Sequence, residues 1–208
     1  MAESKTRRQI AAEETQRVIV AAAAALFVER GYTATSIADI ARAAGVAVQT
    51  IYNSVGSKRD LLSRVLDSAA AGERAPTPVP QFMREEAEAE SDPGRILDQL
   101  VEFWRGGLER TAPVFRVIRQ AAALDPEVAR LERERAEQRL RNYRSPAHLL
   151  AEREALRPGL SEEDAAAVIF SLGHPDIYRF LVREEGWAPE RWAAWVRASL
   201  AAALLKGP

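Results

Sequence analysis

The chain of 208 residues contains no cysteine. This absence excludes disulfide bonds, thiolate metal sites and cysteine nucleophiles, and it fits a reducing compartment. Histidine is also scarce, because only His148 and His174 occur and they lie far apart in the sequence. With no cysteine beside either histidine, we expect no metal site and no other cofactor.

Long apolar runs are absent as well. The longest run spans residues 18–28, whereas a membrane-spanning helix needs about 20 apolar residues. The first residues are polar and lack the apolar centre of a signal peptide. We therefore expect a cytoplasmic protein that does not associate with a membrane.

The sequence motifs of common enzymes are also missing. We find no GxSxG, no P-loop, no HExxH and no GxGxxG-type loop. Carboxylates are abundant, but they lie in charge-rich stretches that are typical of solvated helix surfaces. An enzyme is therefore not expected, although turnover of a substrate would revive that alternative.

Helix-forming residues, by contrast, are plentiful. Alanine, leucine, arginine and glutamate dominate, and alternating β-branched runs are absent, so the composition predicts an all-α fold. A proline-rich and then acidic stretch at 72–93 suggests a boundary, and we expect domains at 1–67 and 68–208. Lysine and arginine number nine against seven acidic residues in the first domain, and twenty against twenty-three in the second. The sign of this weak asymmetry suits DNA binding by the first domain.

The apolar spacing predicts the individual helices. In the first domain they cover about 13–30, 37–44, 48–53 and 58–69, with capping residues at Ser36 and Ser57 and stops at Gly31 and Gly45. In the second domain we expect a short helix around Phe82 and Met83, and helices at 93–110, 113–123, 126–156, 162–172, 176–184 and from Pro189 onward. Pro113, Pro126 and Pro146 are expected to start or kink helices.

Residues 36–54 form the pattern of a helix-turn-helix, in which two short helices flank Gly45. In such a unit the second helix lies in the major groove of DNA. Ile51 is the inward anchor of this helix, and its neighbours face outward: Val48, Gln49, Thr50, Tyr52 and Asn53. Glutamine and asparagine can pair with adenine, valine or threonine can touch a thymine methyl group, and tyrosine, threonine and lysine commonly hold phosphates. From the pattern alone, a three-helix bundle with an exposed polar helix remains the alternative.

The stretch "LFVERGYTATSIADIARAAGVAVQTIYNSVGSK" resembles the amino-terminal domain of TetR-family (tetracycline-repressor-like) transcriptional regulators, over residues 13–62. The matching elements are "GYTATS", "IADIARAAGV", "TIY" and "GSK". The resemblance implies phosphate contacts at Thr35, Thr50, Tyr52 and Lys58, and base contacts at Val48, Gln49 and Asn53. Two positions depart from the family pattern: Ala47 stands where a capping serine is common, and Val55 replaces a common phenylalanine.

The resemblance also implies a second, all-helical domain that binds a small molecule and dimerises. The tail at 174–205 resembles the end of many family members. Its apolar helices could pair with their copies in a four-helix bundle, although a core within one chain is the alternative. The residues expected at the dimer interface are Ile169, Leu172, Phe180, Trp195 and Leu200.

Candidate effector contacts are aromatic or polar residues on the helices that would surround a cavity in this domain. They are Phe82, Phe103, Trp104, Phe115, Arg119, Tyr143 and His174. Each aromatic residue could instead be ordinary core, and Arg119 could serve in an ion pair.

These observations together predict a ligand-responsive regulator, a repressor, that binds a palindromic operator in double-stranded DNA as a homodimer. An unidentified small-molecule effector would release it. A DNA-binding architectural protein without a ligand, and a bundle that only sequesters ligands, are the alternatives.

Overall fold

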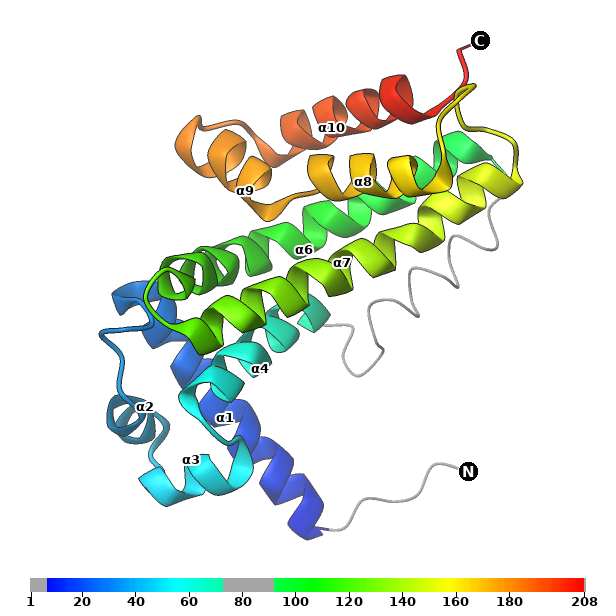
Figure 1. The fold of residues 1–208 in the computed structure, drawn as a ribbon. Coiled ribbons are helices and arrows are strands. Elements are labelled where there is room, and N and C mark those ends of the chain that lie inside the picture. Colours follow the sequence, from blue (N-terminus) through cyan, green and yellow to red (C-terminus); the bar gives the residue numbers. More distant parts are fainter. Residues whose placement is uncertain (1–6, 73–91, 208) are drawn as a thin grey trace. The chain divides into compact units, whose positions relative to one another are not determined.

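A computed structural model describes residues 7–72 and 92–207 of the chain (Figure 1). Its elements are α1 (Arg7–Arg30), α2 (Ile37–Ala44), α3 (Val48–Ser54), α4 (Lys58–Ala71), α6 (Pro93–Ala122), α7 (Pro126–Glu152), α8 (Glu162–Leu172), α9 (Pro175–Tyr178), the π-helix η2 (Arg179–Glu184) and α10 (Pro189–Leu204). Within these ranges there is no strand, only an isolated bridge between Leu156 and Leu205. The predicted all-α fold is confirmed.

The first of two compact units comprises residues 7–69 together with 114–132. α2 and α3 pack against α1, and Ile19, Ile40 and Ile51 are completely buried where they meet. The ends of α6 and α7 complete this core with Val117 and Val128. Each large side chain buried in this way stabilises the fold by about 1.5–3 kcal/mol.

The second unit comprises residues 70–72, 92–113 and 133–207 of the described chain. In it α8 and α10 lie side by side (Figure 1), and its core is built around the buried rings of Trp104 and Trp192. Gly173, at the end of α8, lies against the Trp104 indole so closely that a Cβ atom there would lie 2.3 Å from the ring. Only glycine allows this packing.

The prediction of separate helices at 93–110 and 113–123 is wrong. α6 continues from Pro93 to Ala122 with Pro113 inside it. A proline within a helix removes one hydrogen bond and costs about 3 kcal/mol, but Ala112 and Val114 on either side are both buried in apolar cores. Packing therefore offsets the lost bond. Pro146 likewise lies inside α7.

Two further expectations concern the start of α1 and the residues around Phe82. α1 begins at Arg7 rather than near Glu13, because the exposed residues before Glu13 are helix formers. The expected short helix around Phe82 lies outside the described residues. Throughout the described ranges, no helix is long and apolar enough to cross a bilayer.

Candidate nucleic-acid interface

The first helix of the helix-turn-helix, α2, is fixed at both ends by its own sequence. The Ser36 hydroxyl accepts a bond of 3.1 Å from the Asp39 N–H, and the Asp39 carboxylate accepts one of 3.0 Å from the Ser36 N–H. The hydrogen bonds that the Ser36 hydroxyl and the Ser36 N–H donate to the Asp39 carboxylate lower the pKa of Asp39. At the other end Gly45 adopts a left-handed conformation, with φ of 67°, which turns the chain toward α3. The predicted capping box and glycine stop are confirmed.

α3 presents one buried and several exposed side chains. Ile51 is fully buried against the first core, whereas Val48 is 41% and Tyr52 50% exposed. Gln49 and Asn53 are also exposed, and Thr50 is half-buried. The Gln49 amide donates a hydrogen bond of 2.9 Å to the Asn53 side-chain oxygen, one turn further along the helix. The helix thus exposes adjacent polar groups that match the donor and acceptor pattern of base edges.

The amino-terminal end of α3 carries no side-chain cap. Ala47 occupies the cap position with extended backbone, and no side chain there bonds the first turn. The helix is therefore less well fixed at this end than one that begins with serine, by about 1 kcal/mol. Its carboxy-terminal end is held differently, because the Gln16 side chain of α1 donates a bond of 3.0 Å to the Ser54 carbonyl.

Lys58 opens α4 close to the turn that follows α3. Its ammonium lies 4.2 Å from the centre of the Tyr32 ring, and that ring packs on Phe27 with centroids 5.5 Å apart. Burial lowers the pKa of Lys58, and the carboxylate of Asp125 acts in the opposite direction. The predicted Ser57 cap is confirmed, since Ser57 and Asp60 exchange hydrogen bonds of 3.0 and 3.2 Å.

Thr35 has a different environment from the other residues expected to contact phosphates. It is only 1% exposed, and its hydroxyl donates to the Gly31 and Leu26 carbonyls at 2.8 and 3.3 Å. The hydroxyl thus fastens the turn that follows α1. A buried and bonded hydroxyl cannot reach a DNA phosphate, so Thr35 has a structural role here.

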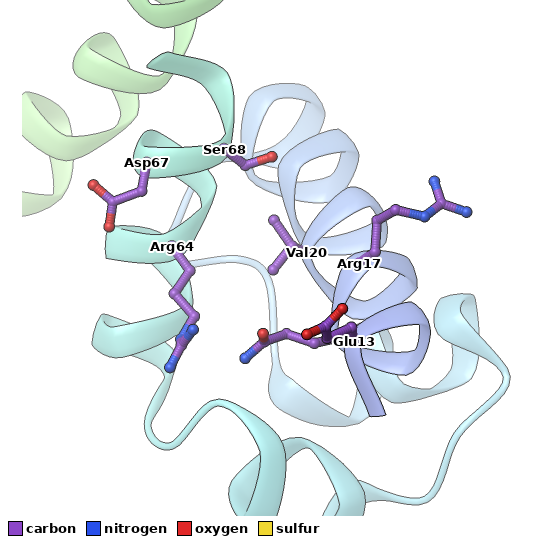
Figure 2. Close-up of a pocket in the computed structure, with 7 residues that line it drawn as sticks. Glu13, Arg17, Val20, Arg64, Asp67 and Ser68 are labelled. Atoms are coloured by element: carbon purple, nitrogen blue, oxygen red, sulfur yellow. The ribbon is translucent and has the colours of Figure 1, made fainter. Parts of the chain in front are cut away.

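A shallow groove of about 260 Å³ lies between α1 and α4 (Figure 2). Figure 2 shows Val20 pointing into the space between the two helices, with Arg64 and Asp67 projecting from α4. The lining residues are Glu13, Gln16, Arg17, Val20, Arg64, Asp67 and Ser68. Arginine and acidic side chains occur in equal number, so the groove has no strong preference for an anion or a cation. Nothing in the sequence pattern pointed to this groove.

Comparison with known proteins identifies the family of the helix-turn-helix region. Residues 19–65 match the family model described as "Bacterial regulatory proteins, tetR family", which covers α2, α3, the second half of α1 and the first part of α4. Residues 19–65 thus form a TetR-family domain. No curated protein matches the sequence closely enough to count as a relative.

Solved structures extend the likeness in fold over the second unit of the chain. NalD of Pseudomonas aeruginosa, described as the secondary repressor of the MexAB-OprM multidrug efflux pump, is 24% identical with a TM-score of 0.75. The match covers 95% of this chain and 100% of NalD. SmeT in complex with triclosan is 19% identical, with a TM-score of 0.70 over 93% and 92% of the two chains. FadR of Bacillus subtilis in complex with stearoyl-CoA is 19% identical, with a TM-score of 0.71 over 88% and 96%. At these identities the likeness concerns the fold.

The residues expected to contact the effector do not form a single group. Phe82 lies outside the described residues. Phe115 and Arg119 belong to the first unit, where Phe115 packs on the first core and Arg119 pairs with Glu132 at 3.4 Å. Phe103 is half-buried beside the second core.

The remaining candidates form an aromatic row in the second unit. The Trp104 indole N–H donates to the Tyr143 hydroxyl at 3.1 Å, and burial raises the pKa of Tyr143. Tyr143 contacts Phe170, with ring centroids 6.4 Å apart, and Phe170 contacts His174 at 5.8 Å. The Arg139 guanidinium lies 5.2 Å from the Phe170 ring centre. Sequence reasoning missed Phe170 and Arg139, because spacing along one helix does not show what a neighbouring helix presents.

The residues expected at the dimer interface fall into two classes. Ile169 and Leu200 are completely buried within the second unit, so they have no surface to offer a second chain. Leu172 is half-buried, whereas Phe180 is 48% and Trp195 36% exposed. Trp195 meets Trp187 edge to face at 6.1 Å, and Arg191 lies 3.9 Å above the Trp187 ring. The exposed aromatic residues therefore lie on η2 and α10.

Proposed function

We propose that the chain is a ligand-responsive transcriptional repressor, which binds a palindromic DNA operator as a homodimer and leaves it when a small molecule binds. The observation that supports this best is the division of α3 into a buried anchor, Ile51, and an exposed polar face. A surface helix of a plain bundle also exposes polar residues, and the match of residues 19–65 to the TetR-family model supports DNA binding over that alternative.

In the proposed complex α3 lies in the major groove. Gln49 and Asn53 pair with adenine edges, and Val48 touches a thymine methyl group. Thr50, Tyr52 and Lys58 contact phosphates and so fix the position of the helix on the duplex. Thr35 is left out of this set because its side chain is buried.

A homodimer follows from the small size of α3. Seven residues contact few bases, so a second copy is needed to read two half-sites about 34–36 Å apart. The exposed rings of Phe180 and Trp195 are the best candidates for a two-fold interface, with Leu172 beside them. Ile169 and Leu200 support this surface from within the second core.

The effector is proposed to bind in the second unit, at the aromatic row. Tyr143, Phe170 and His174 offer aromatic faces, and Arg139 adds a cation that suits an aromatic or acidic molecule. Trp104 is buried in the second core and supports this row by its hydrogen bond to the Tyr143 hydroxyl. Phe103 and Phe82 stay in this proposal, whereas Phe115 and Arg119 leave it because they belong to the first unit. The proposal is in line with the complexes of SmeT with triclosan and FadR with stearoyl-CoA. A molecule that binds one state better than the other shifts the balance between them.

Selection of bound genomic fragments with the purified chain tests this function. The result that supports it is a recovered palindrome with half-sites about one helical turn apart, lost when Tyr52 and Lys58 are both replaced by alanine. Fragments without a shared motif, or retention that survives the double substitution, would contradict it. The recovered operator then serves to screen aromatic acids for release of the bound chain.

A further inference from the structure

The position of α3 depends on its neighbours more than on its own sequence. The helix has seven residues, and a helix of that length is unstable alone. Its cap position is Ala47, which gives no side-chain hydrogen bond. Ile51 fixes the middle of the helix to the core, and Val55, just after its last residue, is buried there as well. These apolar contacts do not fix the direction of the last carbonyls of the helix.

The carboxy-terminal end of α3 is tied to α1 by a long-range hydrogen bond. The last carbonyls of a helix lack partners within it, and the Ser54 carbonyl accepts the Gln16 side-chain amide at 3.0 Å. Only the NH₂ group of glutamine can donate to a carbonyl, so the chemistry fixes how this amide is turned. Both residues are half-buried, which limits competition from water.

We propose that Gln16 is a positioning residue for DNA recognition: it holds the carboxy-terminal end of α3 on α1, in a helix whose other end has no side-chain cap. Asn53, the last expected base reader, directly precedes Ser54, so a shift of this end moves the side chain that must meet a base. This role rests on the proposed function, in which α3 reads DNA. Gln16 itself contacts no base and acts through α3.

Two substitutions remove the donor and keep the side-chain length. Gln16→Met has no polar group, and Gln16→Glu carries a carboxylate that repels the Ser54 carbonyl. Because one net hydrogen bond corresponds to about a tenfold change in an equilibrium constant, we expect operator affinity to fall about tenfold for each half-site. Affinity is measured by fluorescence anisotropy at a temperature where every variant is fully folded. Thr15→Val is the matched control, because its hydroxyl bonds only within α1, to the Ala11 carbonyl.

Rescue separates positioning from general stability. Ala47→Ser adds a cap at the other end of α3 and stabilises the helix without holding its carboxy-terminal end, so it should leave most of the affinity lost in Gln16→Met unrestored. Full restoration of affinity by Ala47→Ser would mean that Gln16 only stabilises the helix. In Gln16→Glu, protonation of the carboxylate below pH about 5 supplies an O–H donor, so its affinity should recover relative to Gln16→Met as the pH falls. Wild-type affinity in folded Gln16→Met protein, even with a lower melting temperature, would overturn the proposal.

A measurement without DNA keeps this inference separate from the proposed function. Amide hydrogen exchange of the free chain should become faster over residues 48–55 in Gln16→Met and stay unchanged in Thr15→Val. If the wild type binds no duplex, the proposed function fails, and the exchange rates still decide whether Gln16 holds α3. Equal exchange over 48–55 in wild type and Gln16→Met overturns the inference in either case.

Discussion

The Lys58 ammonium lies 4.2 Å from the centre of the Tyr32 ring. Tyr32 is 8% exposed and packs on Phe27 in the first core, so the ring is a fixed support at the start of α4. A cation held over an aromatic face gains about 0.5–1 kcal/mol when it is near the surface. The arrangement limits the orientations of Lys58, and less entropy is then lost when the side chain meets a phosphate.

Lys58→Met should weaken binding to every DNA sequence by a similar factor. The substitution keeps the apolar stem and removes the charge, so one phosphate contact is lost in each half-site. The slope of log affinity against log salt should then decrease by about two for a dimer. Anisotropy titrations at several salt concentrations measure the slope, with Lys58→Arg as the control that keeps it. An unchanged slope in Lys58→Met would remove Lys58 from the contact set.

Tyr32 should make the chain less stable at high pH. Burial, reinforced by the carboxylate of Asp125, raises the pKa of Tyr32 from 10.0 to about 12. Between these values the unfolded state releases the phenolic proton and the folded state keeps it, so the free energy of unfolding falls as pH rises from about 10 toward 12. Urea unfolding at pH 9 and pH 11 checks this. Tyr32→Phe should lose less stability over that interval than the wild type, and equal losses would contradict the assignment.

Substitutions of Ile51 and Val48 should have different effects on the stability of the fold and on DNA recognition. Ile51 is completely buried, so Ile51→Ala should lower the free energy of unfolding by about 2–5 kcal/mol. Val48 is 41% exposed on the same helix, so Val48→Ala should change stability by less than about 0.5 kcal/mol yet weaken operator binding. Urea denaturation and anisotropy give the two quantities. A stable Ile51→Ala variant would mean that α3 is not anchored by this side chain.

Exposed aromatic residues of the second unit should govern assembly. Trp195→Glu and Phe180→Glu each place a charge on the proposed two-fold surface, so sedimentation velocity should show single chains and operator affinity should collapse. Leu124→Glu is the matched control: Leu124 is 77% exposed and belongs to the first unit, so this variant should remain dimeric. Dimers that persist in both glutamate variants would place the interface elsewhere.

Local chemistry explains why the helix-turn-helix could be predicted from the sequence. The signals that fix it act within a few positions of the chain. They are a serine three residues before an aspartate, a glycine after the last turn of α2, and one isoleucine among the polar residues of α3. The ends of α2 and the inward direction of Ile51 follow from these signals alone. The absence of a cap at Ala47 could also be read from a single residue type.

Contacts between distant segments could not be predicted in the same way. The sequence pattern predicts the apolar helix faces around Ile169 and Leu200. It does not show whether such a face is covered by its own chain or by a second copy. Pro113 predicted a helix break, and burial on both sides of it decided otherwise. The Phe170–His174 contact and the Gln16–Ser54 bond join residues whose meeting depends on the packing of helices, which spacing along one helix does not encode.

The central claim is that the exposed face of α3 reads base edges, twice in each assembly. Selection from a fully randomised duplex library, with wild type and with Asn53→Ala in parallel, tests it most directly. The Gln49 amide donates to Asn53 at 2.9 Å, so removal of Asn53 also releases Gln49. We expect the wild type to recover a palindrome, and Asn53→Ala to relax the preference at one or two symmetry-related positions in each half-site, at a cost of about 1–3 kcal/mol per lost pairing. An identical motif from both proteins, or a motif without two-fold symmetry, would contradict the account.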